Sequence, residues 1–184
     1  MKKELLIIGG PNGSGKTTFA KVFLKEKKFE FLNADEIAKE KGTKTNISAG
    51  KEYFKRLEIL TKQKKNIAIE STLSGLFLKN LIQNFRKDDY EINIVYLTLD
   101  APETCIERIK VRVKKGGHDV PDEDVKRRFY RSKNNFWNIY KSQADTWLMI
   151  DNKESQWKEI AFGTKSKYTI AEQEYFNKFI KDIK

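Results

Sequence analysis

The sequence predicts a single α/β domain built on a five-stranded parallel sheet with helices on both faces. Short apolar runs alternate with helical patterns along the chain, an order typical of parallel sheets. The first apolar run leads into a glycine-rich loop and then a helical pattern. The length of 184 residues suits one domain, with a core at about 4–152 and a C-terminal extension at 153–184.

The apolar run at 5–8 predicts the first central strand, because strands of parallel sheets are buried on both faces. The segment at 10–17 fits G-x-x-x-x-G-K-[ST], the phosphate-binding P-loop, and the strand, loop and helix follow in the required order. Its lysine would contact the β- and γ-phosphates of ATP, and its threonine would ligate Mg²⁺. The expected nucleotide-binding residues are Gly10, Pro11, Asn12, Gly13, Ser14, Gly15, Lys16, Thr17 and Thr18, with Thr17 on the metal.

The remaining elements follow from apolar periodicity and from turn residues. Further strands are expected at 29–32, 66–69, 92–99 and 147–150. Helices are expected at 18–24, 36–41, 48–64 with Ser48 as its cap, 74–86, 102–114 and 123–140. The segment at 42–47 reads as a polar loop. In the tail, residues 157–162 have a strand pattern and residues 170–183 an amphipathic helix pattern with Phe176, Phe179, Ile180 and Ile183 together.

Two carboxylates follow strands at the edge where parallel sheets bind ligands. Asp35 follows the second strand and could accept the proton of an attacking hydroxyl or hold Mg²⁺ through water. The alternative is that Asp35 caps the helix; Asn33 with Glu36 three residues later also resembles a capping box. Glu70 follows the third strand and could bind a substrate hydroxyl or a metal-bound water, unless it is simply solvated. Thr72 adds a hydroxyl for substrate, or caps the next helix.

Arginines on two successive helical patterns predict a lid. Arg108 and Arg112 are four residues apart, and Arg128 and Arg131 are three apart, so each pair shares one helix face. Such guanidinium groups can stabilise charge on a transferring phosphoryl group, and Gly116-Gly117 between the helices would serve as the hinge. For any single arginine, a solvated surface is the simpler interpretation.

Composition limits the function classes. The net charge is +11, but its lysines are scattered and no aromatic–basic motif is present, which favours a solvated surface over nucleic-acid binding. Cys105 is the single cysteine, which excludes an internal disulfide and fits a reducing cytoplasm. His118 is the single histidine, which argues against zinc. No stretch reaches the ~18 apolar residues of a membrane span.

Read together, these segments resemble the zeta-toxin family of P-loop kinases, in its compact branch often labelled predicted ABC-type ATPase. The resemblance covers residues 4–152. The segments that carry it are residues 10–18, 33–37, 49–51, 70–75, 108–113, 116–121, 127–129 and 151–152. It implies an adenylate-kinase-like fold and transfer of phosphate from ATP, with Mg²⁺, to a hydroxyl of UDP-N-acetylglucosamine. It also implies an antitoxin partner.

By the same resemblance, Asp35 looks like the general base, and Lys16 and Thr17 look like the phosphate and Mg²⁺ ligands. Glu70 looks like a substrate or metal-site acid, and Arg112 and Arg128 look like lid arginines on the phosphates. Lys51 departs from the arginine common in this branch, and Glu70-Ser71-Thr72 lacks the second threonine often found there. We therefore expect an ATP-dependent small-molecule kinase. The alternatives are a nucleoside or polynucleotide kinase and a non-catalytic ATP-binding interaction protein.

Overall fold

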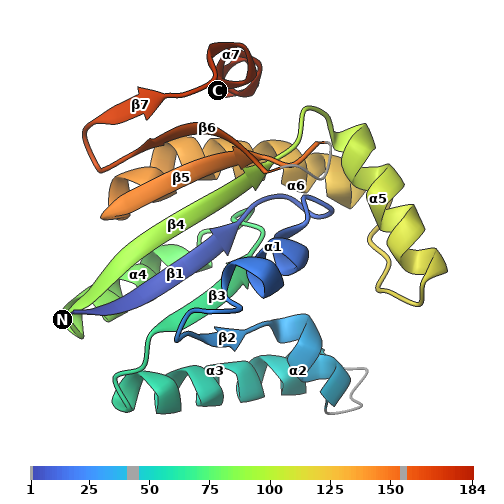
Figure 1. The fold of residues 1–184 in the computed structure, drawn as a ribbon. Coiled ribbons are helices and arrows are strands. Elements are labelled where there is room, and N and C mark those ends of the chain that lie inside the picture. Colours follow the sequence, from blue (N-terminus) through green and yellow to red (C-terminus); the bar gives the residue numbers. More distant parts are fainter. Residues whose placement is uncertain (1, 41–45, 154–156) are drawn as a thin grey trace.

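A computed structural model describes residues 2–40, 46–153 and 157–184. Its centre is a seven-stranded sheet in the order β2-β3-β1-β4-β5-β6-β7 (Figure 1). The first five strands in this order run parallel, as predicted, whereas β6 and β7 add two antiparallel strands at one edge. The strands are β1 (Lys3–Gly9), β2 (Glu30–Leu32), β3 (Ile67–Ser71), β4 (Tyr90–Thr98), β5 (Thr146–Asp151), β6 (Lys158–Gly163) and β7 (Tyr168–Ile170).

Helices cover both faces of this sheet (Figure 1). Along β1, Leu5 and Ile7 enter the larger core on one face, whereas Leu6 and Ile8 enter the smaller core on the other. The smaller core packs against α1, and the larger one against α3, α4, α7 and the turn that follows α6. The helices are α1 (Lys16–Phe23), α2 (Ala34–Glu40), α3 (Asn46–Lys62), α4 (Phe77–Lys87), α5 (Pro102–Lys114), α6 (Asp122–Asn135) and α7 (Gln173–Lys181).

Several boundaries differ from the sequence predictions. Helix α3 begins at Asn46, so the prediction that Ser48 caps it is wrong; the Ser48 hydroxyl is buried and makes no hydrogen bond within the described residues. Most of the expected polar loop, residues 42–45, lies outside the described residues. The predicted helix at 123–140 ends as α6 at Asn135 and continues as one π-helical turn, Phe136–Tyr140.

The C-terminal extension completes the larger core. Its strand pattern becomes β6, but the predicted helix at 170–183 is shorter because β7 pairs with β6 before α7 begins. Phe176 and Phe179 of α7 are buried in the larger core. Lys133 of α6 is almost fully buried and forms an ion pair with Asp182 at the end of α7. The extension is therefore integral to this side of the domain.

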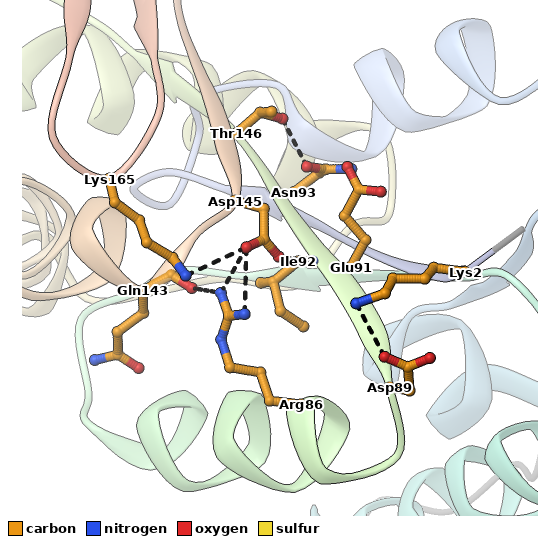
Figure 2. Close-up of polar contacts among 10 residues, drawn as sticks. All are labelled: Lys2, Arg86, Asp89, Glu91, Ile92, Asn93, Gln143, Asp145, Thr146 and Lys165. Atoms are coloured by element: carbon orange, nitrogen blue, oxygen red, sulfur yellow. Dashed lines mark hydrogen bonds and ion pairs between the residues drawn. The ribbon is translucent and has the colours of Figure 1, made fainter.

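A polar network closes the amino-terminal end of β5. Figure 2 shows Asp145, the residue before β5, between Arg86 of α4 and Lys165 of the β6–β7 turn, at 3.2 and 3.4 Å. The Ile92 backbone N–H also donates to Asp145 at 2.8 Å. Burial alone would raise the pKa of Asp145, but these donors outweigh it and lower the pKa. The network thus ties α4, β4 and the antiparallel edge together, away from the carboxyl ends of the strands.

Candidate functional site

The glycine-rich loop between β1 and α1 has the backbone that a phosphate cradle needs. Gly15 has φ of +89°, and a Cβ placed there would lie 2.3 Å from the Asn152 side-chain nitrogen. Two buried side-chain oxygens of the loop, Asn12 Oδ1 and Ser14 Oγ, have no hydrogen-bond partner within the described residues. Of these two atoms only the Ser14 hydroxyl can donate, so beside the positive-φ glycines it fits an anion-binding loop that still has a hydrogen bond to make, whereas the Asn12 amide oxygen can only accept.

Lys16 is the first residue of α1 and lies under the loop. It is 8% exposed, and its Nζ donates to the Pro11 carbonyl at 2.9 Å. Burial lowers the pKa of Lys16, although the nearby Glu70 carboxylate opposes that shift. A buried ammonium with one hydrogen bond among the described residues has donor capacity left for a phosphate.

Thr17 and Glu70 form the polar centre of the site. Parallel pairing of β1 with β3 sets Ile8 opposite Glu70, so this carboxylate reaches the P-loop from the neighbouring strand. Thr17 Oγ1 donates to Glu70 at 2.9 and 3.1 Å. Burial raises the pKa of Glu70 despite the nearby Lys16 cation. Strand β3 runs on to Ser71, so the alternative of a solvated residue after a strand ending at Ile69 is wrong.

Asp35 lies at the second position of α2 and lines the cleft together with Lys16, Thr17 and Glu70. Asn33, not Asp35, caps this helix: its side-chain oxygen accepts from the backbone N–H groups of Asp35 and Glu36 at 2.8 and 3.2 Å. The other end of the Asn33 amide donates to Glu70 at 2.6 Å. The cap interpretation of Asp35 is therefore wrong, and its exposed carboxylate faces the cleft.

The cleft has a volume of about 940 Å³ and lies at the carboxyl ends of β1, β2 and β3. Thr72 lines it, and its hydroxyl contacts Ser74 Oγ at 2.8 Å. Thr72 does not cap the next helix, because α4 begins only at Phe77 and has no side-chain cap. A larger groove of about 1200 Å³ crosses the sheet face beside β4 and β5, but it contains none of the P-loop residues. The chemistry therefore points to the smaller cleft.

The predicted lid arginines Arg112 of α5 and Arg128 of α6 line the cleft. A loop joins these two helices (Figure 1), and Gly116-Gly117 lies within it. Arg112 donates to the His118 carbonyl at 2.6 Å, and its buried Nε has no partner within the described residues. Arg128 lines the cleft and pairs with Asp124 at 3.4 Å. Of the remaining predicted arginines, Arg108 also lines the cleft but is engaged with the backbone of the segment after β5.

The segment after β5 contributes residues to which the sequence assigned no role. The Asn152 side chain donates to the Ser14 carbonyl of the P-loop at 2.8 Å. Arg108 donates to the Asn152 and Lys153 carbonyls at 2.6 and 2.7 Å. Trp157 lines the cleft and packs edge-on against Phe19 of α1, with ring centroids 5.0 Å apart. These contacts join residues more than 40 positions apart, so no local sequence pattern could predict them. The one sequence signal for this region was the Asp151-Asn152 segment of the family resemblance.

The single cysteine and the single histidine of the sequence have different environments in the structure. Cys105 is buried in a core cluster, and burial raises the pKa of its thiol to about 12, which suits a core residue rather than a nucleophile. His118 lines the cleft. Within 2–40, 46–153 and 157–184, no cluster of three or more His, Cys, Asp or Glu side chains could hold a metal ion. In the same ranges no helix has the length and apolar character needed to cross a membrane.

A family model described as an AAA domain matches residues 5–132. An uncharacterized protein of Haemophilus influenzae is 28% identical over 133 residues, which cover 70% of this chain and 94% of the relative. A cytidylate kinase of Archaeoglobus fulgidus is 25% identical over 162 residues, which cover 79% of this chain and 82% of the relative.

Solved structures share the fold. The AvrRxo1-ORF1:AvrRxo1-ORF2 complex aligns with a TM-score of 0.76 at 15% identity, over 97% of this chain and 63% of the matched chain. This chain thus spans less than two thirds of that protein's length. A structure from the PezAT chromosomal toxin–antitoxin system of Streptococcus pneumoniae aligns with a TM-score of 0.66 at 16% identity, covering 99% of this chain and 78% of the other.

Proposed function

This chain belongs to the AAA domain family, and we propose that it is an ATP-dependent kinase that transfers the γ-phosphoryl group to an acceptor hydroxyl. One observation carries the proposal: the P-loop shares its cleft with the carboxylate of Asp35 and with Arg112 and Arg128. Phosphoryl transfer needs cations around the phosphate and a carboxylate that receives the proton of the nucleophile. A nucleotide-binding module without catalysis needs no such set.

In the proposed reaction, Asp35 accepts the proton of the acceptor hydroxyl as the hydroxyl oxygen attacks the γ-phosphorus. An oxygen–phosphorus bond forms, the bond from the γ-phosphorus to the β–γ bridging oxygen breaks, and ADP leaves. Lys16, Arg112 and Arg128 balance the charge on the transferring group. Mg²⁺ held through Thr17 would supply further positive charge at the β- and γ-phosphate oxygens.

The two carboxylates of the cleft suit different roles. Glu70 already accepts hydrogen bonds from Thr17 and Asn33, so its oxygens are committed to organising the P-loop side. The exposed Asp35 carboxylate has no hydrogen bond or ion pair to another side chain among the described residues. A general base must reach the proton it removes, and this favours Asp35.

We propose a UDP-sugar, with UDP-N-acetylglucosamine first, as the acceptor, bound beside Asp35, Glu70 and Thr72. The support is the zeta-toxin-like motif set and the fold shared with the structure from the PezAT toxin–antitoxin system. On the same grounds, an antitoxin protein is a proposed partner. Lys39, one helical turn after Asp35, also lines the cleft and suits an acceptor that carries phosphate.

A nucleotide kinase is the second candidate, because one relative aligned over most of this chain is a cytidylate kinase. The acceptor would then be a nucleoside monophosphate, whose phosphate oxygen takes the place of the hydroxyl. The same cleft cations would serve either acceptor. The net charge of +11 makes a 5′-hydroxyl oligonucleotide the third acceptor to test.

The test is transfer from γ-labelled ATP, with Mg²⁺, to UDP-N-acetylglucosamine, CMP and a 5′-hydroxyl oligonucleotide in parallel. The proposal expects a labelled sugar nucleotide. Label in CDP would instead support the nucleotide kinase. If ATP binds tightly and no acceptor is labelled, the kinase proposal fails and a non-catalytic ATP-binding role replaces it.

A further inference from the structure

Asn33 makes contacts with both sides of the cleft through a single side chain. It follows β2, is 7% exposed and directly precedes α2. Its oxygen accepts from the backbone N–H groups of Asp35 and Glu36, and its nitrogen donates to Glu70 Oε2 at 2.6 Å. Strands β2 and β3 are neighbours in the parallel sheet, so both partners are held by regular structure.

The chemistry of the partners fixes the orientation of this amide. Two backbone N–H groups require an acceptor, and a carboxylate requires a donor, so only one arrangement of the Asn33 oxygen and nitrogen satisfies all three. Aspartate would keep the acceptor but turn a second carboxylate oxygen toward Glu70. Serine would keep a capping oxygen but is too short to reach Glu70 as well.

We propose that Asn33 is a positioning residue that holds Glu70, and through it the Thr17 hydroxyl, in register with the helix that carries Asp35. The amide links the side of the cleft that binds the nucleotide to the side that receives the acceptor. Its hydrogen bond also favours the ionised form of Glu70, against the effect of burial. The inference rests on the proposed function for its effect on turnover, but its effect on Mg²⁺-dependent ATP binding does not require turnover.

The experiment compares Asn33→Asp and Asn33→Ser with wild type, each alone and combined with Glu70→Gln. Calorimetry gives the affinity for ATP with and without Mg²⁺, and turnover gives kcat and KM for the acceptor. Both variants keep the cap of α2, but Asn33→Asp also sets a second carboxylate against Glu70, so we expect its melting temperature to fall, whereas Asn33→Ser should stay closer to wild type. We expect Mg²⁺-dependent ATP affinity and kcat to fall by about 10- to 100-fold, as for other residues that orient metal ligands, with KM for the acceptor little changed.

The double variants separate positioning from a general structural effect. If Asn33 acts through Glu70, then Asn33→Ser should cause no further loss once Glu70 is glutamine. Losses that add in full, or an Asn33→Asp protein that binds Mg²⁺ and ATP as wild type does, would overturn the inference. A wild-type protein that binds ATP but labels no acceptor would refute the kinase proposal, while the binding measurements would still decide the role of Asn33.

Discussion

The Thr17 hydroxyl lies 2.9 and 3.1 Å from the two carboxylate oxygens of Glu70, which joins the P-loop to the neighbouring strand β3. A hydroxyl has one proton to donate, and here it goes to Glu70. The lone pairs of the same oxygen stay available, as a metal ligand requires. Glu70 therefore orients the P-loop hydroxyl, and this relationship leads to the first prediction.

Glu70→Gln should stabilise the fold at neutral pH while it weakens the site. Burial raises the pKa of Glu70, so the folded protein prefers the protonated acid. The stability from this preference is present below the unfolded-state pKa and is lost as pH rises through the folded-state pKa. The melting temperature of Glu70→Gln should exceed that of wild type more at pH 8 than at pH 4. A difference in melting temperature between variant and wild type that is larger at pH 4 than at pH 8 would contradict this prediction.

Arg128→Ala should lower kcat by about 10²- to 10³-fold, the usual effect of removing one donor to developing charge. Arg127→Ala is the matched control. Both arginines pair with Asp124, at 3.4 Å for Arg128 and 2.8 Å for Arg127, but only Arg128 lines the cleft. Steady-state kinetics should show near-normal kcat for the control. Equal losses of kcat in the two variants would mean that Arg128 affects turnover only by stabilising helix α6, as Arg127 does.

Gly15→Ala should weaken ATP binding by more than tenfold. The new Cβ meets the Asn152 nitrogen at 2.3 Å, and φ of +89° strains any residue with a side chain by about 1–2 kcal/mol. Gly50→Ala is the control, because a Cβ there meets nothing within 4 Å. Adding Asn152→Ala to Gly15→Ala should recover part of the affinity in a binding titration. Complete recovery would show that backbone strain at Gly15 is unimportant.

Asp145→Asn should destabilise the protein by about 1.5–3 kcal/mol at neutral pH, the range for hydrogen bonds to a charged group, without changing kcat. The donors Ile92 N–H and Arg86 lower the pKa of Asp145, so its stabilising effect is present above the unfolded-state pKa and is lost as pH falls through the folded-state pKa. Denaturant titrations at pH 7 and pH 4 should show the gap between variant and wild type narrowing in acid. A changed kcat would mean that this distant network influences the cleft.

The parallel core was predictable because its signals are local. The apolar run of β1, the P-loop spelling and the proline at the start of α5 each fix an element within about ten residues of sequence. The position of Asp35 and Glu70 at strand ends then places both in one cleft. This part of the site follows from strand order alone.

What the sequence left open depends on contacts between distant segments. Strand β7 exists because Tyr168–Ile170 pairs with β6, and its three residues have too little pattern to distinguish them from the start of a helix. The reach of the Asn152 amide to the Ser14 carbonyl spans 138 positions. The Asn33 cap was visible locally, but its second bond, to Glu70, was not. A side chain that links two distant helices or strands can be assigned its role only once the tertiary structure is known.

The proposed role of Asp35 as the general base can be measured through phosphoryl transfer from γ-labelled ATP by Asp35→Ala. Glu36→Gln is the control, since Glu36 lies in the same turn but pairs with Lys21 of α1 at 3.0 Å. We expect Asp35→Ala to bind ATP normally and to lose about 10²- to 10⁴-fold in transfer to the acceptor, while the control stays active. Full transfer by Asp35→Ala would contradict the proposed role.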